Sequence, residues 1–480
     1  MMKKNFKRTI SLALVAAAMT GVVGCNGNGN TGAGQTADPS EKGTPVSFAP
    51  LTMRGVEKDE MPIGGFMAPT AQYTGNGYAL PSLITDEVFG YLKECGINNV
   101  IDTKIDVSKN AELAETVLTL ADKYEISWFI QSTSVHDLKR AGTGTVLADA
   151  ANLAAELKRL ADAHPYYAGL YGMDEPSNDL YPYIKNSWDT VKEARNLLGA
   201  GYEDLSIYYN LYPPCPQIGK DENGRTIDYQ TYLDGYVETG AEYLQFDMYP
   251  IYGEEGTTTT WFSLLGQINN TVKKANIPWV GYIQCGGYFY DNNVGTEHRI
   301  CNENELNWDV NTMLAFGAKG VSYFPCMFPP EWSAIPNELA QANSLIDKYG
   351  NKTPYWYYAK KINTQIAAID HVLMNSAHMG VILSGKGEGF YGEGDDCFSS
   401  FRQLLSVSGD PALVGCFDYK GGTALYVVNN TFDEHRGEIT LSFDRAYEYE
   451  VIQRGVTGSI TAQEFVLTLE AGEGALVVLK

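Results

Sequence analysis

The stretch that decides the fold is Tyr167-Ala168-Gly169-Leu170-Tyr171-Gly172-Met173-Asp174-Glu175-Pro176. It is an apolar run of strand length that ends abruptly in two carboxylates and a proline. An amphipathic helical pattern, with apolar residues three and four positions apart, precedes it over residues 149–163. A helix followed by a buried strand is one unit of a chain in which helices and parallel strands alternate.

The same unit recurs along the chain, about 30 to 40 residues apart, and a second clear helical pattern covers residues 111–123. We therefore predict an α/β fold, a (β/α)₈ TIM barrel, in which functional side chains gather at the carboxyl ends of the strands. The eight predicted strands are Ile63–Ala68, Asn98–Thr103, Ser127–Ser132, Tyr167–Met173, Leu205–Leu211, Tyr243–Met248, Trp279–Gln284 and Gly320–Pro325.

The pattern changes after the eighth strand. Residues 355–374 read as one long helix, and short strands separated by turns follow it. We expect the barrel over residues 49–350, a connecting helix over 351–378 and a small all-β domain, a β-sandwich, over 379–480. The strands expected in that domain are Met379–Leu383, Ala424–Asn429, Glu438–Phe443, Glu448–Gln453, Glu464–Leu469 and Ala475–Leu479.

The chain begins with a basic segment and an apolar run, Ile10–Val23, that is short for a transmembrane helix and typical of an export signal. The following Gly24-Cys25 resembles the lipobox of bacterial lipoproteins. We expect residues 1–25 to be a signal peptide with Cys25 as the lipidated residue, and residues 26–48, rich in Gly, Asn and Thr, to be a disordered tether. The protein would then lie at the cell surface, attached to the membrane through the lipid alone; an ordinary secreted protein with a chance cysteine is the alternative.

The amino-acid composition limits the classes of molecule that we expect this protein to bind. A formal net charge of −23 disfavours nucleic acid and anionic lipid, because an acidic surface repels phosphate, and 12% aromatic residues suit a carbohydrate, whose C–H faces stack on flat rings. The six histidines are scattered, the seven cysteines after Cys25 form no CxxC spacing, and no glycine-rich phosphate loop follows a strand. We expect neither a metal nor a cofactor, and buried free cysteines, with Cys285 and Cys301 as one pair that could still bond.

Two strand ends resemble a known family. The segment ending in Asp174-Glu175-Pro176 resembles the clan A glycoside hydrolases, in which strand four ends in Asn-Glu-Pro or a close variant. Phe246-Asp247-Met248-Tyr249-Pro250 is similar to the Trp-Asp-x-Tyr-Pro stretch of the β-galactosidase branch. The resemblance implies that Glu175 is the general acid/base and makes Asp247 the candidate second carboxylate.

Four further residues are candidate substrate-binding groups because they lie at or beside the same strand ends: Asp174, Asn210, Tyr249 and Gln284. Simpler interpretations exist. Asp-Glu-Pro is also a typical helix start, and Asp247 could cap its own turn.

One position departs from the family pattern. Retaining clan A enzymes carry a nucleophilic glutamate at the end of strand seven, where this chain has Gln284. Three explanations remain: another carboxylate such as Asp247 or Glu331 serves, the substrate supplies its own nucleophile, or the site binds glycan without cutting it. We favour the first, and we predict a glycoside hydrolase that acts on extracellular oligo- or polysaccharide by carboxylate acid/base catalysis. A displaced carboxylate acting on water would give an inverting enzyme, with two carboxyls roughly 6.5–9.5 Å apart; the sequence leaves the anomeric outcome open. A non-catalytic glycan-binding lipoprotein on a hydrolase-like barrel is the alternative.

Overall fold

The computed structural model describes residues 45–75, 78–135, 149–252, 256–257, 260–287, 298, 300–328, 344–385, 387, 397–432 and 435–480. The expected signal peptide, Cys25 and most of the tether lie outside these ranges, as does Glu331. Within the described ranges, no helix is both long enough and apolar enough to span a bilayer.

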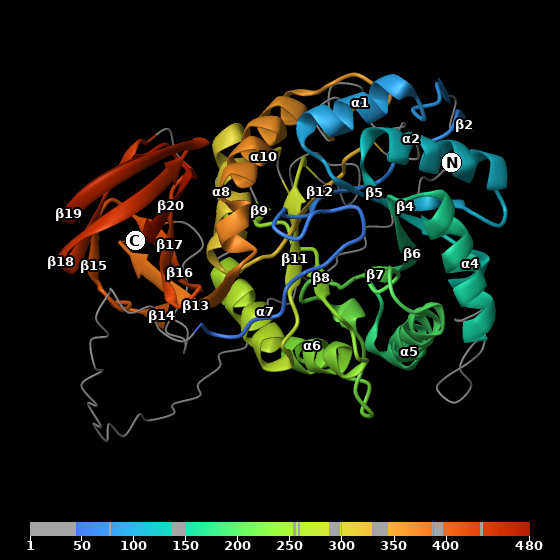
Figure 1. The fold of residues 1–480 in the computed structure, drawn as a ribbon, viewed down its shortest axis with the longest axis horizontal. Helices are drawn as coiled ribbons and strands as arrows, with labels where there is room; N and C mark the ends of the chain where they lie inside the picture. The colour runs from blue at the N-terminus through green and yellow to red at the C-terminus, as the bar shows by residue number, and fades with distance from the viewer. Residues whose placement is uncertain are drawn as a thin grey trace, which may run out of the picture. The chain divides into compact units, whose positions relative to one another are not determined.

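All eight predicted barrel strands are present (Figure 1). They form one parallel sheet in the order β7-β6-β5-β4-β1-β12-β11-β8, and a parallel bridge between Leu211 and Phe246 joins β7 to β8. Two backbone hydrogen bonds support this closure: Leu211 N–H donates to Gln245 O (2.8 Å) and Asp247 N–H donates to Leu211 O (3.3 Å). The predicted barrel is therefore confirmed. Its strands are β1 (Ile63–Phe66), β4 (Asn99–Asp106), β5 (Ser127–Gln131), β6 (Tyr167–Asp174), β7 (Ser206–Asn210), β8 (Leu244–Phe246), β11 (Trp279–Gln284) and β12 (Val321–Phe324).

Seven helices in the described ranges alternate with these strands. Several begin at a side-chain cap, which satisfies backbone N–H groups of the first turn: Asp149 caps α4, and Asn302 forms a capping box with Glu305 at α8. The two helices expected around residues 111–123 and 149–163 are α2 and α4. The seven are α1 (Asp86–Cys95), α2 (Ala111–Tyr124), α4 (Ala150–Ala163), α5 (Tyr181–Leu198), α6 (Tyr229–Glu238), α7 (Trp261–Ala275) and α8 (Glu303–Ala315).

The long helix after β12 is α10 (Pro354–Leu373), which we expected to connect two domains. It lies in the chain between the last barrel strand and β13, and it packs between α1 and α8, on the outside of the barrel (Figure 1). Trp356 donates to Tyr91 O of α1 (2.9 Å), and Tyr355 donates to Cys301 O just before α8 (2.7 Å). Its apolar face thus takes the place of the eighth barrel helix.

The barrel interior is filled by side chains rather than open. Six buried residues from six strands form its core: Phe66, Ile101, Phe129, Ala168, Tyr208 and Tyr282. The hydroxyls of Tyr208 and Tyr282 hydrogen-bond to each other, and the Phe66 ring meets the Tyr282 ring edge-on with centroids 5.5 Å apart. The residues at the carboxyl ends of the strands pack on this layer of side chains.

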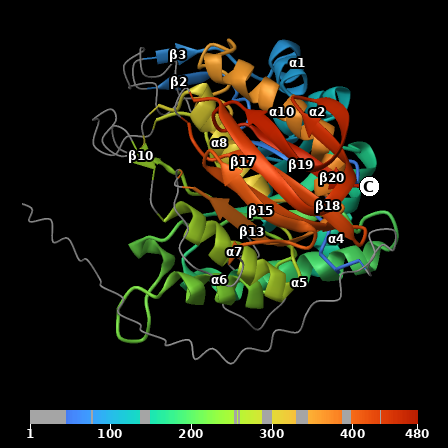
Figure 2. The same ribbon diagram turned by 90° about the vertical axis from the view of Figure 1, so that its left-hand side faces the viewer.

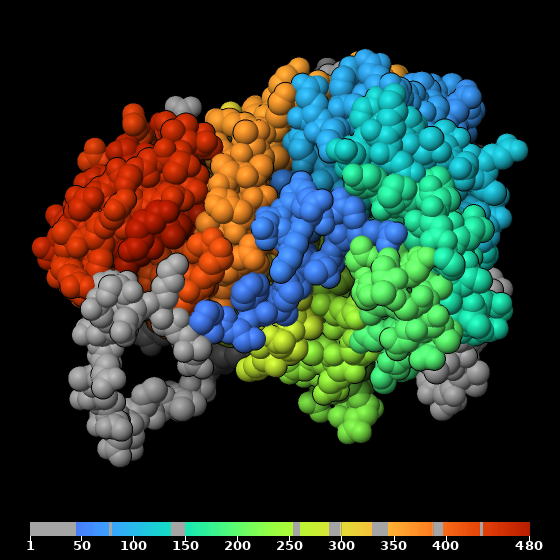
Figure 3. All heavy atoms as spheres, viewed as in Figure 1, coloured from blue at the N-terminus to red at the C-terminus, as the bar shows by residue number. Residues whose placement is uncertain are grey.

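The amino ends of the strands are covered by the chain itself. Figure 3 shows the first described residues, in blue, lying across the barrel. Arg54 holds this segment by donating to Gly201 O (2.9 Å) and Asp204 Oδ1 (3.1 Å), and Ser127 Oγ donates to Arg54 O (2.7 Å).

The C-terminal β domain is a mostly antiparallel sheet with strand order β14-β13-β16-β17-β20-β18-β15, and β19 pairs with β18 (Figure 2). We predicted two strands where the structure has one, β18, with a register shift between Ser442 and Tyr447, and did not predict β14, β15 or β16. The strands are β13 (Ser376–Ser384), β14 (Cys397–Phe398), β15 (Leu404–Gly409), β16 (Ala412–Tyr419), β17 (Gly422–Asn429), β18 (Gly437–Gln453), β19 (Val456–Leu469) and β20 (Gly474–Leu479).

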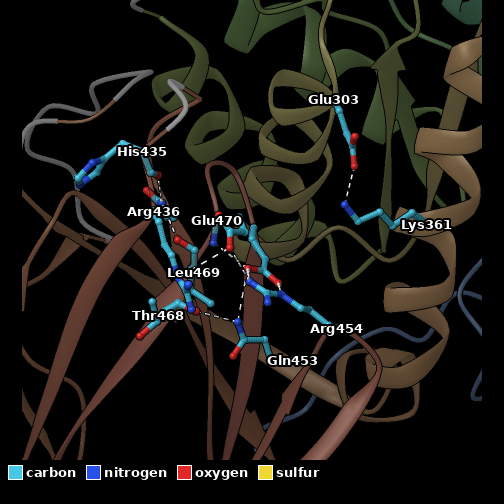
Figure 4. A network of polar contacts seen from close by, with 11 residues as sticks. Glu303, Lys361, His435, Arg436, Gln453, Arg454, Thr468, Leu469 and Glu470 are labelled. Carbon is cyan, nitrogen blue, oxygen red and sulfur yellow. Dashed lines mark hydrogen bonds and ion pairs between the residues drawn. The ribbon is translucent and has the colours of Figure 1, made fainter.

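Both faces of the central β16 and β17 are buried, because one faces the domain's own core and the other packs toward the barrel. Trp308 of α8 donates to Asn430 Oδ1 (2.8 Å), and Tyr426 of β17 donates to Asn311 Oδ1 (2.6 Å). Figure 4 shows a polar network of the β domain, in which Arg454 donates to Glu470 (3.2 Å). Arg454 Nε also donates to Glu473 Oε1 (2.6 Å). The β domain is therefore docked on α8 by specific hydrogen bonds.

Candidate functional site

The predicted site residues from neighbouring strands meet at the carboxyl end of the barrel. Asp174 ends β6, Asn210 ends β7 and Asp247 directly follows β8. Asn210 Nδ2 donates to Asp174 Oδ1 (2.9 Å) and to Asp247 Oδ1 (3.2 Å). Asp247 also shares a side-chain hydrogen bond with Glu175. The three acids thus form one compact group, which we call the carboxyl cluster: Asp174, Glu175 and Asp247.

The backbone of β6 is shaped to present two consecutive acids. The register of β6 against β7 shifts between Tyr171 and Met173, and a Cβ at Gly172 would lie 2.6 Å from Tyr208 O, so this bulge requires glycine. Glu175 has φ 48°, in the left-handed region, and its N–H donates to Asn210 O (2.9 Å). Neighbouring strand residues ordinarily point to opposite faces, so the conformation of Glu175, which costs roughly 1–2 kcal/mol, turns its side chain toward the same mouth as Asp174.

Burial raises the pKa of every acid in the carboxyl cluster, and the charges of neighbouring acids raise those of Glu175 and Asp247 further. Burial, followed by the charge of Asp174, raises the pKa of Glu175 to about 7. Burial, followed by the charges of Glu175 and Asp174, raises the pKa of Asp247 well above its usual value, and burial raises that of Asp174. Since like charges this close cannot all ionise, the cluster retains a proton near neutral pH, the state that a general acid requires.

The side chain of Asn210 is shielded from solvent and binds two of the acids. It is 2% exposed, and its amide group gives one N–H to each of two carboxyls. In the structure Asn210 fixes Asp174 and Asp247, and the substrate-binding role expected from sequence stays a prediction.

Gln284 departs from the expectation. It is fully buried, its Oε1 accepts from Ile251 N–H (2.9 Å), and its Nε2 donates to Ile251 O (3.1 Å) and Gly286 O (3.3 Å). A primary amide can match both the backbone donor and the backbone acceptor of one residue, whereas a carboxylate cannot. Gln284 therefore clamps the chain that follows Asp247 and does not line the mouth beside Glu175.

Aromatic rings lie at the same end of the barrel as the carboxyl cluster, since Phe324 ends β12 and Tyr249 follows β8. The rings of Tyr249 and Phe324 are stacked, with centroids 5.6 Å apart and planes 22° apart, and His298 meets Tyr249 edge-on at 5.8 Å. Tyr249 and Phe324 are partly exposed. Flat rings at the same end as the acids suit a sugar, because they offer apolar surface to its C–H faces.

The sequence analysis missed one residue near the acids. Cys215 is half-buried, and the charges of Glu175 and Asp247 contribute, after burial, to raising its pKa. Its place in Pro213-Pro214-Cys215-Pro216, directly after β7, was the available signal. Seven cysteines fall in the described ranges and all are free thiols, Cys285 and Cys301 included. The same ranges contain no group of three or more His, Cys, Asp or Glu side chains arranged to hold a metal ion.

Comparisons with known proteins return structural similarity alone. No protein-family model matches the chain, and no curated protein sequence matches it. Among solved structures, an Anoxybacillus α-amylase is 11% identical with a TM-score of 0.47, covering 88% of this chain and 98% of its own. A β-galactosidase from the psychrophilic Marinomonas ef1 is 10% identical with a TM-score of 0.44, covering 68% and 63%. A GH27 β-L-arabinopyranosidase from Geobacillus stearothermophilus is 12% identical with a TM-score of 0.43, covering 88% and 96%.

Proposed function

We propose that this protein is a glycoside hydrolase that cleaves O-glycosidic bonds of extracellular oligo- or polysaccharide, with Glu175 as its general acid. The carrying observation is a half-buried carboxyl at the carboxyl end of the barrel whose pKa is raised to about 7. Glycosidic cleavage needs such an acid because the leaving alkoxide must be protonated as the bond breaks. Tyr249 and Phe324 would hold the sugar by stacking.

Asp247 has a supporting part in this proposal. Its carboxyl is bound by Asn210 and hydrogen-bonded to Glu175, so it keeps the proton of the pair close to Glu175 and holds that side chain in place. The two carboxyls are in direct contact, closer than the roughly 6.5–9.5 Å expected for an inverting pair. We therefore no longer assign Asp247 as the base that activates water in an inverting reaction.

Activity on aryl glycosides and polysaccharides, with the products identified by mass, tests the proposal. Glu175→Gln should lower kcat/KM about 10²–10⁴-fold for natural glycosides and less for aryl glycosides with an activated leaving group. Asp189→Asn, which removes a partly exposed carboxylate of α5, is the matched control and should leave the rate unchanged. Equal losses on both kinds of substrate would contradict the role of Glu175.

A glycan-binding protein without turnover is the second candidate, and the structural role of Gln284 favours it, because no carboxylate occupies the end of β11. Calorimetry with the same oligosaccharides separates the two. Affinity without cleavage on any linkage, unchanged in Glu175→Gln, would replace the hydrolase proposal with this one.

The lipid anchor at Cys25 belongs to the proposal as well, because it would place the site outside the cell. Cys25→Ser should move the protein from the membrane fraction to the medium. Retention of the variant in the membrane fraction would contradict the anchor and leave the proposed activity unaffected.

A further inference from the structure

The carboxyl cluster supplies a proton donor but no attacking group. A glycosidase needs its nucleophile or base on the face of the sugar opposite the leaving group, with the two carboxyls roughly 5–5.5 Å apart for a covalent intermediate or 6.5–9.5 Å apart for a water between them. Asp174 and Asp247 both lie within hydrogen-bond distance of one nitrogen, Asn210 Nδ2, and Asp247 touches Glu175. The three acids are therefore too close together to flank a bound sugar, and all of them would lie on the same side of it.

Three other buried acids, two on β4 and one on α8, accept hydrogen bonds from backbone N–H groups. Asp102 is fully buried and accepts from the N–H groups of Lys104 and Ile105 at 2.9 and 3.0 Å. Asp106 accepts from Ser108 N–H (2.8 Å) at the turn before α2, and Asp309, behind β11, accepts from Gln284 N–H (2.9 Å). Each of these three carboxylates caps or supports backbone, so none of them is placed to attack a sugar.

We propose that the attacking group is the carbonyl oxygen of a 2-acetamido substituent, so that the substrate is an N-acetylhexosaminide. This inference rests on the proposed function. Such an oxygen reaches the anomeric carbon of its own ring and attacks it from the face opposite the leaving group, so a barrel with acids on one side is sufficient.

Asp174 is the orienting group in this reaction. It directly precedes Glu175, is partly exposed at the mouth, and has Oδ1 held by Asn210, which leaves Oδ2 as the acceptor for the acetamide N–H. An acceptor on that N–H increases the electron density on the carbonyl oxygen and stabilises the positive charge that the amide gains as it attacks.

The steps balance with water as the only co-reactant. In the first step the bond from the acetamide oxygen to C1 forms, the bond from C1 to the leaving oxygen breaks, and the Glu175 proton goes to that oxygen. This gives a cyclic oxazolinium or, if Asp174 takes the N–H proton, an oxazoline. In the second step the Glu175 carboxylate removes a proton from water, the water oxygen bonds to C1, the bond from C1 to the acetamide oxygen breaks, and Asp174 returns the N–H proton if it took it, which restores the acetamide. The anomeric configuration is retained.

Paired substrates test the inference on the full chain. 4-Nitrophenyl 2-acetamido-2-deoxyglucosides and galactosides, in both anomers, should be hydrolysed about 10²-fold or more faster than the matching hexosides that carry a 2-hydroxyl. Replacing the acetyl group by trifluoroacetyl, which weakens the carbonyl oxygen as a nucleophile, should slow the reaction by a similar factor. A thiazoline analogue of the cyclic intermediate should inhibit competitively.

Variants separate Asp174 from a general structural effect. Asp174→Asn should lower kcat on the acetamido substrates about 10²-fold with little change in KM, and should flatten the dependence on fluorination, whereas Asp189→Asn should do neither. Turnover of plain hexosides at rates equal to the acetamido sugars would overturn the inference while the hydrolase proposal stands. So would an activity that Glu331→Gln abolishes and fluorination leaves unchanged. Failure to cleave any glycoside would instead overturn the proposed function.

Discussion

The two ends of the barrel handle buried charge in opposite ways. At the amino ends, Lys319 is buried and donates to the carbonyls of Leu373 (2.5 Å) and Ser376 (2.6 Å), while Asn98 Oδ1 accepts from Ile63 N–H (2.7 Å). At the carboxyl ends, three acids face one another around one amide. The amino end pairs buried polar groups with backbone of opposite polarity, which suits a structural end. The carboxyl end concentrates like charge, which costs stability and produces a raised pKa.

The free energy of unfolding should therefore change with pH in opposite directions at the two ends. The pKa of Glu175 is raised from 4.5 to about 7, so its contribution is fully present below pH 4.5 and is lost as pH rises toward 7. Burial lowers the pKa of Lys319 from 10.5 to about 7, so its charged form penalises the folded state at low pH, and stability is regained between pH 7 and 10.5. Each proton changes the free energy by about 1.4 kcal/mol per pH unit.

Chemical denaturation of three proteins between pH 4 and 10.5 measures these slopes. In wild type the free energy of unfolding should fall as pH rises to 7 and increase again above pH 7. Glu175→Gln should lack the first change, and Lys319→Met should lack the second. Asp102, whose burial raises its pKa to about 6, contributes equally to all three proteins and cancels in the differences. If the free energy of unfolding of wild type and of Glu175→Gln changed with pH in parallel, ionisation of Glu175 would not destabilise the folded state.

The rate should show the same raised pKa at the carboxyl end alone. Because Glu175 must be protonated to act as an acid, kcat/KM should fall about tenfold per pH unit above pH 7. In Asp174→Asn the fall should begin at lower pH, because the charge of Asp174 is, after burial, the second cause that raises the pKa of Glu175. Lys319→Met should leave the profile where it is. A profile that does not move in Asp174→Asn would contradict the electrostatic coupling of the two acids.

A substitution at Gln284 should have a smaller effect, and it distinguishes a structural role of this residue from a catalytic one. In Gln284→Glu a carboxylate oxygen would face the carbonyls of Ile251 and Gly286, where Nε2 now donates, so we expect a loss of about 1–3 kcal/mol in unfolding free energy. The exposed Gln72→Glu is the control and should change stability little. A variant of unchanged stability that gains turnover on plain hexosides would show that the end of β11 can still host a nucleophile.

Sequence patterns predicted the elements that local apolar runs specify. They failed to predict features that depend on contacts between residues far apart in the sequence. The eight barrel strands are short apolar segments between helical patterns, and all eight were found. Strand β16, Ala-Leu-Val-Gly-Cys-Phe in its first six residues, was missed although its apolar run is like that of the predicted β17; both strands are buried on both faces and lack the alternation that marks a half-exposed strand. Gln284 was placed at the correct strand end, but its partner Ile251 lies 33 positions away, in the two-residue strand β9 (Ile251–Tyr252), whose path no local pattern specifies.

The smallest expected effect concerns the side of the barrel, where polar groups are paired across the contact between α8 and the β domain. Tyr426 donates its hydroxyl to Asn311 Oδ1 (2.6 Å), so Tyr426→Phe removes one buried hydrogen bond and should cost about 0.5–1.5 kcal/mol. Tyr449→Phe is a matched control, because the buried Tyr449 hydroxyl has no hydrogen-bond partner among the described residues, so its removal should be neutral or stabilising. Urea denaturation measures both, and neither variant should alter kcat, since the carboxyl cluster shares no contact with either tyrosine. Equal losses in the two variants would mean that packing of the rings, and not the bond to Asn311, holds the β domain against α8.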